Sequence, residues 1–439
     1  MKKEIILLDF KALTKIQSIF LIAIIFVAAV GGTVVYFLLS RQATSETIKI
    51  GLFFNMNSAW GKSAWQGLVL AAEQLNLEGG ILGREVEVVS EDSTAGVDAN
   101  QFILALARLI TYHDVDFIIG SSSGLGHSVQ DVIYEHKIIF FELASPEDEY
   151  TQRVLDDYDS YKYYFRVGLN NTSTFLGITD NLLFFREETD FNKVGYLGED
   201  LPWTKGIMEG LDYVLPEVYG FDLIHKGSFP PDTVDFSSYF AAAEAAGVEI
   251  LMPLIALDTA IPFVKEYNTR QSPMLIYGGV LGVGVSGPEG WEITDGKCEY
   301  TASASLPAIA GYPLTSVTLP FRNSYIDRWG EIPDMFACRA YDVLRFILPD
   351  AVGRAGTLDV DAVIKALEAT SVETTNARAF TFTSSHDLMM ANPNDPDDDN
   401  SLVIYFQWVD GEQVPVYPKK IMEEADATYK FPEWPGPWD

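Results

Sequence analysis

The sequence predicts an α/β protein with two doubly wound parallel-sheet lobes, preceded by an N-terminal transmembrane helix. Short apolar runs of strand length alternate with amphipathic helical segments, and this alternation occurs in two successive series, at 48–143 and 193–277. Parallel strands need long crossover connections, which are usually helices, so the alternation favours parallel sheets. A third observation, an uncharged apolar run at 17–40, predicts the transmembrane helix.

The first series sets the expected order of elements. Strands are expected at 48–54, 85–91, 115–120 and 137–143, and helices at 63–76, at 98–112 and from 128 onward. The Gly-Gly-Ile-Leu-Gly-Arg segment at 79–84 predicts a turn between the first helix and the second strand, because glycine tolerates positive φ angles.

The second series has the same order. Strands are expected at 193–198, 221–226, 248–254 and 274–277, with helices at 204–213, 236–246 and 260–268. Beyond residue 298 the pattern changes to helices at about 319–329, 335–352 and 359–369. Asp410-Gly411 between two apolar runs predicts a β-hairpin. The two series together predict two α/β units of similar construction.

The composition excludes several classes of protein. The formal net charge of −32 makes a surface that repels nucleic acid and anionic lipid headgroups, so no nucleic-acid partner is expected. Two cysteines, Cys298 and Cys338, exclude a disulfide scaffold and a multi-cysteine metal site, while a bond between the two stays open. The acidic loop at 391–400 lacks the glycine and terminal glutamate of an EF-hand, so we expect a solvated loop there and not a calcium site. No metal or cofactor is implied elsewhere in the sequence.

Residues 1–46 are expected to form a cytoplasmic stub, a transmembrane signal anchor and a short linker. The apolar run at 17–40 is close to the length of about 20 residues that spans a bilayer, and it is longer than the apolar region of a cleaved signal peptide. Four lysines precede it and Arg41 follows it, which favours a cytoplasmic N-terminus. Cleavage near 40–43 is the alternative; in both cases the rest of the chain is expected outside the membrane.

The loop at 120–124, Gly-Ser-Ser-Ser-Gly, joins the expected strand at 115–120 to the next helix. Free N–H groups at the helix start, beside three hydroxyls, favour a small anionic group such as a carboxylate. The same letters form a Gly-x-Ser-x-Gly pattern, typical of the nucleophile turn of serine hydrolases. That chemistry requires a histidine and an acid placed by the fold, and the five histidines lie in no recognisable partner motif. A binding loop is therefore favoured over a secreted serine hydrolase.

Six segments occur together in an order and at a spacing that point to one family. They are IKIG at 48–51, GGILGREVE at 79–87, SED at 90–92, VDFIIG at 115–120, DFS at 235–237 and RAYD at 339–342. The chain resembles the leucine/isoleucine/valine-binding proteins, which are substrate-binding subunits of ABC importers with the type I periplasmic-binding-protein fold. The resemblance covers roughly 48–382, and the segment at 79–87 is its most specific part.

The resemblance implies two α/β lobes joined by a three-crossover hinge, with a ligand held in the cleft at the carboxyl ends of the strands. The first lobe would comprise 47–168 plus 300–378, and the second lobe 169–299 plus 379–430, which leaves 431–439 as a tail. Crossovers are expected near 166–169, near 298–302 and near 380.

The resemblance also places the ligand contacts. The family's carboxylate-binding loop corresponds to Ser121, Ser122 and Ser123. A second carboxylate contact after the next strand corresponds to Ala144 and Ser145. The two aromatic residues that bracket the ligand correspond to Trp60 and Trp203.

The positions that hold the ligand ammonium in amino-acid-binding members depart from the family pattern. They fall on Asn171 and Val280, and the second-lobe tyrosine falls on Ile255 or Ala256. A desolvated ammonium without a carboxylate is costly, so a nearby acid would have to replace the missing one. The candidates for that role are Glu142, Glu147 and Asp258. Otherwise the resemblance leaves an amide, a urea-like compound or an apolar carboxylate as the ligand.

In function, the resemblance implies a membrane-anchored, extracellular substrate-binding protein of an ABC importer, not an enzyme. Its partners would be a small solute of the branched-chain amino acid or amide class, the ABC permease and ATPase subunits, and the membrane through the N-terminal helix. A sensory ligand-binding ectodomain of the same fold is the alternative, but about 16 residues before the apolar run are too few for a signalling domain.

Overall fold

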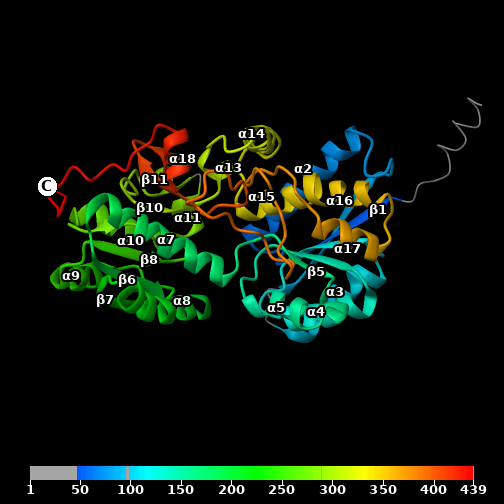
Figure 1. The fold of residues 1–439 in the computed structure, drawn as a ribbon, viewed down its shortest axis with the longest axis horizontal. Coiled ribbons are helices and arrows are strands. Elements are labelled where there is room, and N and C mark those ends of the chain that lie inside the picture. The colour runs from blue at the N-terminus through cyan, green and yellow to red at the C-terminus, as the bar shows by residue number, and fades with distance from the viewer. Residues whose placement is uncertain (1–46, 95–97, 288, 439) are drawn as a thin grey trace, which may run out of the picture.

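The computed structural model describes residues 47–94, 98–287 and 289–438. Two α/β lobes lie side by side along the long axis of the molecule, each with helices on both faces of a parallel sheet (Figure 1). The expected cytoplasmic stub, transmembrane helix and linker at 1–46 lie outside the described residues. Within the part of the chain that is described, no helix combines the length and apolar character needed to cross a bilayer.

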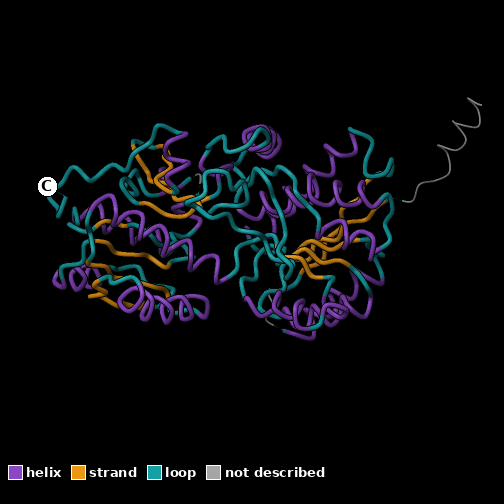
Figure 2. The backbone as a smooth tube through the Cα atoms, in the orientation of Figure 1, coloured by secondary structure: helices purple, strands orange, loops and turns teal. Residues whose placement is uncertain are grey.

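The first lobe contains a five-stranded sheet in the order β2-β1-β3-β4-β5, with all neighbours parallel. Its strands are the orange segments in the right half of Figure 2. Its elements are β1 (Ile48–Phe54), α2 (Ala59–Leu77), β2 (Val86–Asp92), α3 (Ala99–Thr111), β3 (Phe117–Gly120), α4 (Gly126–His136), β4 (Ile139–Glu142), α5 (Asp148–Asp156), α6 (Tyr158–Tyr161) and β5 (Tyr164–Arg166). β3 and β4 are buried at every position, which explains their continuous apolar sequence. This order confirms the predicted parallel sheet.

Helices from later in the chain complete the first lobe. They are α13 (Pro307–Ala310), α14 (Thr318–Trp329), α15 (Met335–Asp342), the π-helical turn η4 (Val343–Ile347), α16 (Leu348–Ala355) and α17 (Val360–Glu368). α15 lies so close to α2 that a Cβ added at Gly67 would be 2.3 Å from the carbonyl oxygen of Ala337. Because only glycine permits this approach, Gly67 sets the spacing of the two helices.

The second lobe contains a four-stranded parallel sheet in the order β7-β6-β8-β9 and a three-stranded antiparallel sheet in the order β10-β11-β12. Its elements are α7 (Asn171–Thr189), β6 (Lys193–Glu199), α8 (Pro202–Tyr213), the π-helical turn η3 (Val214–Val218), β7 (Asp222–Phe229), α9 (Ser237–Ala246), β8 (Ile250–Leu254), α10 (Ala260–Arg270), β9 (Leu275–Ile276), α11 (Val283–Ser286), α12 (Gly290–Ile293), β10 (Ala302–Ser305), β11 (Ile404–Val409), β12 (Glu412–Tyr417) and α18 (Lys419–Glu424). The predicted hairpin is present: Asp410 and Gly411, both with positive φ, join β11 to β12.

Two lobe boundaries differ from the expected ones. The chain was expected to re-enter the first lobe at residue 300, but β10 pairs with β11 of the second lobe, and Ala308 is the first later residue in the first lobe's core. The reason is that the alternating Ala-Ser residues of β10 form a strand that continues the second lobe. The final crossover was expected near residue 380, but Phe380 and Phe382 are buried in the first lobe, and Val403 is the first residue to pack on the second lobe's core.

A buried ion pair ties two of the crossovers together. Arg166, the last residue of β5, donates from Nε and Nη2 to the carboxylate of Asp387 at 2.7 and 2.9 Å. Thr151 and Asn170 also donate to this carboxylate, at 2.7 and 3.0 Å. The Arg166 and Asp387 side chains are only 1% and 8% exposed, so the first and last connections between the lobes share one desolvated network.

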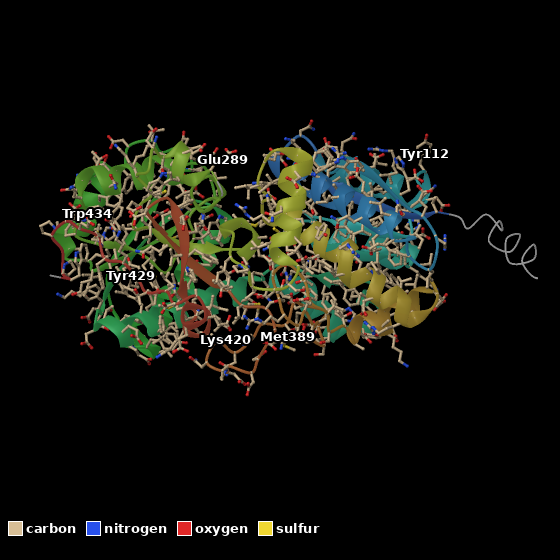
Figure 3. All side chains as sticks on the ribbon, turned by 90° about the horizontal axis from the view of Figure 1, so that it is seen from above. Tyr112, Glu289, Met389, Lys420, Tyr429 and Trp434 are labelled. Atoms are coloured by element: carbon tan, nitrogen blue, oxygen red, sulfur yellow. The ribbon has the colours of Figure 1, made fainter. Side chains whose placement is uncertain are left out.

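The C-terminal segment, left unassigned by the sequence, packs on the second lobe (Figure 3). Trp434 is buried in that lobe's core and donates from Nε1 to the carbonyl oxygen of Ser272 at 2.8 Å. The two cysteines are free and do not pair, because Cys298 is buried in the second lobe and Cys338 in the first.

Candidate ligand-binding cleft

An open cleft of about 850 Å³ lies between the two lobes. Its first-lobe wall comes from the start of α2 and from loop residues before α15. Its second-lobe wall comes from the loops after β7 and β8 and from the segment of α11 and α12. The residues that define these walls are Ser58, Trp60, Lys62, Gln66, Glu331 and Asp334 on one side, and Asp232, Val234, Ala256, Leu257, Asp258 and Glu289 on the other. The cleft thus lies at the carboxyl ends of strands, where open α/β sheets bind ligands.

Trp60 lies on the first-lobe wall and is 39% exposed. It is held there by the helix start: Ser58 accepts the amide N–H of Gly61 at 3.0 Å, and a Cβ at Gly61 would be 2.0 Å from the carbonyl oxygen of Asn55. The Trp60 ring packs against Phe336 of α15, with centroids 5.7 Å apart. An exposed indole on a cleft wall is suited to contact with an apolar or cationic ligand.

The cleft wall is acidic. Asp232, Asp258, Glu289, Glu331 and Asp334 line it, and Lys62 forms an ion pair with Glu331 at 3.1 Å. Asp334 caps α15 by accepting the amide N–H groups of the two residues after Met335, both at 2.9 Å, and burial raises the pKa of Asp334. The wall therefore carries an excess of negative charge.

The predicted carboxylate loop is brought together with the turn after β4, as expected from the order of the strands. Ser121, Ser122 and Ser145 are buried, and the Ser122 hydroxyl donates to the Ser145 hydroxyl oxygen at 2.8 Å. However, Glu142 at the end of β4 is fully buried beneath them and accepts the amide N–H groups of Ser122, Ala144 and Ser145, each at 2.8 Å. The backbone donors expected to hold a ligand carboxylate are occupied by this side chain.

The second lobe repeats this arrangement at Glu199, the last residue of β6. Its carboxylate accepts the amide N–H of Ala256 at 2.8 Å and that of Leu257 at 3.3 Å, and the Thr259 hydroxyl also donates to it. The loop after β8 therefore reaches the cleft with these amide groups already paired.

Trp60 and Ala256 line the cleft, whereas the serine loop and the other predicted contacts do not. Ile255 is fully buried in the second-lobe core, and its amide N–H donates to the carbonyl oxygen of Val280 at 2.9 Å. Trp203 is half-buried against the core, with its Nε1 buried and without a partner. Asn171 begins α7, where its amide N–H donates to the carbonyl oxygen of Pro146 at 2.8 Å. Ser123 is half-buried, and its amide N–H donates to the Ser121 hydroxyl at 3.1 Å.

The three acids considered as partners for a ligand ammonium lie in different environments. Glu142 is used within its lobe, and Glu147 is half-buried with Oε2 lacking a partner and its pKa raised by burial. Asp258 lines the cleft. The sequence reasoning missed residues 231–234 and Glu331, Ile332 and Asp334, which also line the cleft. The rule that ligands bind after strand ends points to 231–234, since the expected strand at 221–226 precedes them.

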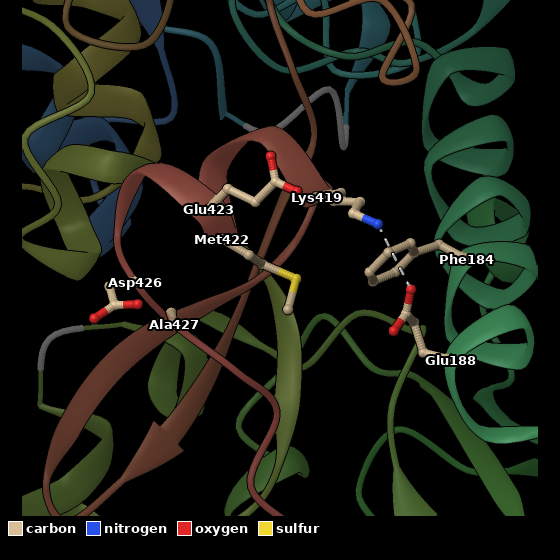
Figure 4. Close-up of a pocket in the computed structure, with 7 residues that line it drawn as sticks. All are labelled: Phe184, Glu188, Lys419, Met422, Glu423, Asp426 and Ala427. Atoms are coloured by element: carbon tan, nitrogen blue, oxygen red, sulfur yellow. Dashed lines mark ion pairs between the residues drawn. The ribbon is translucent and has the colours of Figure 1, made fainter.

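A second, smaller pocket of about 220 Å³ lies between α7 and α18 (Figure 4). Lys419 and Glu188 approach to 4.0 Å across it, with both side chains more than half exposed. It lies away from the strand ends, so we do not assign it to ligand binding.

The serine hydrolase alternative finds no support in the geometry. Ser122 is fully buried, and among the described residues no histidine hydrogen-bonds to it. Within the described ranges, no group of three or more His, Cys, Asp or Glu side chains is arranged to hold a metal ion.

The model of the periplasmic binding protein family matches residues 47–392. The chain belongs to this family. A relative of this periplasmic binding protein is Leu/Ile/Val-binding protein homolog 7 of Brucella melitensis biotype 1, which is 25% identical over 381 residues, covering 85% of this chain and 92% of the relative. The predicted resemblance to the leucine/isoleucine/valine-binding proteins is confirmed.

Solved structures of other periplasmic binding proteins share the fold. A Silicibacter pomeroyi protein assigned to branched-chain amino acid ABC transport has a TM-score of 0.75 at 20% identity, covering 90% of this chain and 100% of its own. LivJ of Streptococcus pneumoniae, solved with isoleucine, has a TM-score of 0.67 at 17% identity, covering 85% and 100%. A solute-binding protein of R. palustris, solved with benzoate, has a TM-score of 0.63 at 15% identity, covering 86% and 99%. Proteins of this fold therefore bind chemically different small molecules.

Proposed function

We propose that this protein is the substrate-binding subunit of an ABC importer and captures a small solute in the cleft between its lobes. Residues 1–46 would tether it to the cell membrane, with both lobes on the outer side. Its further partners would be the permease and ATPase subunits to which the captured solute is delivered. The role is binding and delivery, without chemical change of the solute.

The observation that carries this proposal is the cleft itself. It is open, it has walls from both lobes, and it lies at the carboxyl ends of the strands. A ligand in it would touch both lobes at once, so binding favours whichever relative orientation of the lobes gives the most contacts. Closure about the three crossovers would then bury the ligand, as in hinge-closing binding proteins.

Solute binding is tested with purified protein and a panel of aliphatic amino acids, their amides, and small carboxylates and amines. Stabilisation against thermal unfolding identifies a ligand, because a molecule that binds only the folded state raises the unfolding midpoint. We expect at least one compound to do so, with a dissociation constant measurable by calorimetry and a smaller radius of gyration in solution scattering. A panel without any stabilising compound would contradict the proposal.

Transport is tested separately in cells. Deletion of the gene should reduce uptake of the radiolabelled solute that binds in vitro, and the wild-type gene should restore it. Unchanged uptake, despite tight binding in vitro, would contradict the importer role and favour the sensory alternative.

A further inference from the structure

Glu142 is placed where a carboxylate ligand would have been expected. One of its oxygens accepts the amide N–H groups of Ala144 and Ser145, and the other accepts the amide N–H of Ser122 and the hydroxyl of Tyr164, the latter at 3.1 Å. The three amide bonds are each 2.8 Å long. Three amide donors converging on one fully buried carboxylate form a complete anion site, filled from within the chain.

The neighbouring amide groups offer no substitute. The amide N–H of Ser121 donates to the carbonyl oxygen of Phe53 at 2.9 Å, and that of Ser123 donates to the Ser121 hydroxyl at 3.1 Å. A carboxylate from solution would have to displace Glu142, which is held in place by the chain and acts at a high effective concentration. Displacement would also leave Glu142 buried without donors, which is costly.

The charge of the cleft also disfavours a solute that carries a carboxylate. Asp232, Asp258 and Glu289 line the wall, form no ion pair with any residue in the described part of the chain, and face the same space as Asp334. Lys62 is already paired with Glu331. An anionic solute would meet net repulsion here, whereas a positive or neutral one would not.

The positive charge of Arg339 would favour an anionic solute, so its effect on binding is tested as well. Its Nη1 donates to the carbonyl oxygen of Leu143 at 2.6 Å, and its guanidinium lies 5.9 Å from the Phe336 ring centroid. It forms no ion pair with any described carboxylate, although it lies beside the turn that contains Ala144.

We propose that Glu142 fills, with the protein's own side chain, the carboxylate subsite that the family resemblance implies, and that this occupation together with the acidic wall makes the cleft select a neutral or cationic solute of the amine or amide class. The selectivity rests on the proposed function; the occupation of the subsite does not.

The occupation is tested by chemical rescue. Glu142→Ala removes the carboxylate and leaves three amide donors around a small cavity. We expect a lower unfolding midpoint, and a saturable recovery of several degrees on adding formate, with sodium chloride at equal ionic strength as the comparison. Wild type and Glu147→Ala, a change in the same loop at a carboxylate whose Oε2 has no hydrogen-bond partner, should show no such recovery. If Glu142→Ala does not fold, Glu142→Gln is used, with a smaller recovery expected. Absence of a formate-specific effect in the folded variant would overturn the assignment.

The selectivity is tested with four compounds that share one branched apolar group: leucine, leucinamide, 3-methylbutylamine and 4-methylpentanoate. Wild type should bind the amide or the amine at least tenfold more tightly than either carboxylate. Tighter binding of a carboxylate, with at least a tenfold loss on Arg339→Met, would overturn the selectivity and make Arg339 the anion receptor. Formate rescue without binding of any solute would count against the transport function and leave the role of Glu142 intact.

Discussion

The Arg166–Asp387 pair gives the sharpest prediction about stability. Asp387→Ala removes both short bonds to the guanidinium and the acceptor of Thr151 and Asn170, while Arg166 stays buried. Removing one partner of a buried ion pair costs about 3–5 kcal/mol, because the remaining charge is left without compensation. Arg166 keeps its bonds to two backbone carbonyl oxygens, at 2.7 and 3.1 Å, so we expect about 3–4 kcal/mol.

The free energy of unfolding is measured in urea by circular dichroism. The matched control is Glu73→Ala, which breaks the exposed pair with Arg328 and should cost less than about 1 kcal/mol. The double variant Arg166→Met with Asp387→Leu should recover part of the loss, because both charges are removed together. Two results would contradict this reasoning: a cost of Asp387→Ala no greater than that of Glu73→Ala, or additive effects of the changes at Arg166 and Asp387 on the free energy of unfolding.

Three further predictions concern a buried acid, a helix contact and the cleft. Burial raises the pKa of Asp342 to about 7, above its unfolded value of about 4. Between about pH 4 and pH 7 the folded chain therefore keeps the Asp342 proton that the unfolded chain loses. Asp342 thus lowers the free energy of unfolding as pH rises through this range, by up to about 4 kcal/mol. Asp342→Asn should flatten the difference in urea stability between about pH 4.5 and 7.5, and equal slopes would refute the assignment. Gly67→Val should destabilise by about 1–3 kcal/mol or prevent folding, because a Cβ at this position would be 2.3 Å from α15. The control Gly206→Ala, whose Cβ would meet nothing within 4 Å, should stabilise the protein slightly. Equal effects of the two changes in thermal unfolding would refute the contact. Trp60→Ala should weaken solute binding about tenfold in calorimetry with little loss of stability, unlike Tyr112→Ala, which changes a side chain that is 80% exposed; equal affinities would remove Trp60 from the site.

The sequence predicted the parallel sheets well because buried strands such as β3 and β4 are continuously apolar. Such apolar runs can be recognised without knowledge of the rest of the chain. It predicted the lobe boundaries less well. β10 is short and rich in alanine and serine, and only its pairing with β11, far away in the chain, makes it a strand.

The candidate site divides in the same way. Trp60 was predicted to contact a ligand because it follows a strand end, and the structure places it on the cleft wall. The role of Glu142 was not found: as the last residue of an apolar strand it was considered as a partner for a ligand ammonium. Which donors its carboxylate meets depends on the packing of β3 beside β4, and that is a property of the folded sheet.

The interleaving of the lobes along the chain has a consequence for how the protein folds. α2 is made early, but α15, which packs against it around Gly67, is made only after most of the second lobe. The second lobe in turn lacks β11 and β12 until the end of the chain. Neither lobe can bury its full core when only its first segment has been made, and such distant contacts slow folding and prolong the exposure of apolar surface. The first lobe therefore lacks part of its buried core until Phe382 is made, and the second lobe lacks part of its core until Trp434 is made.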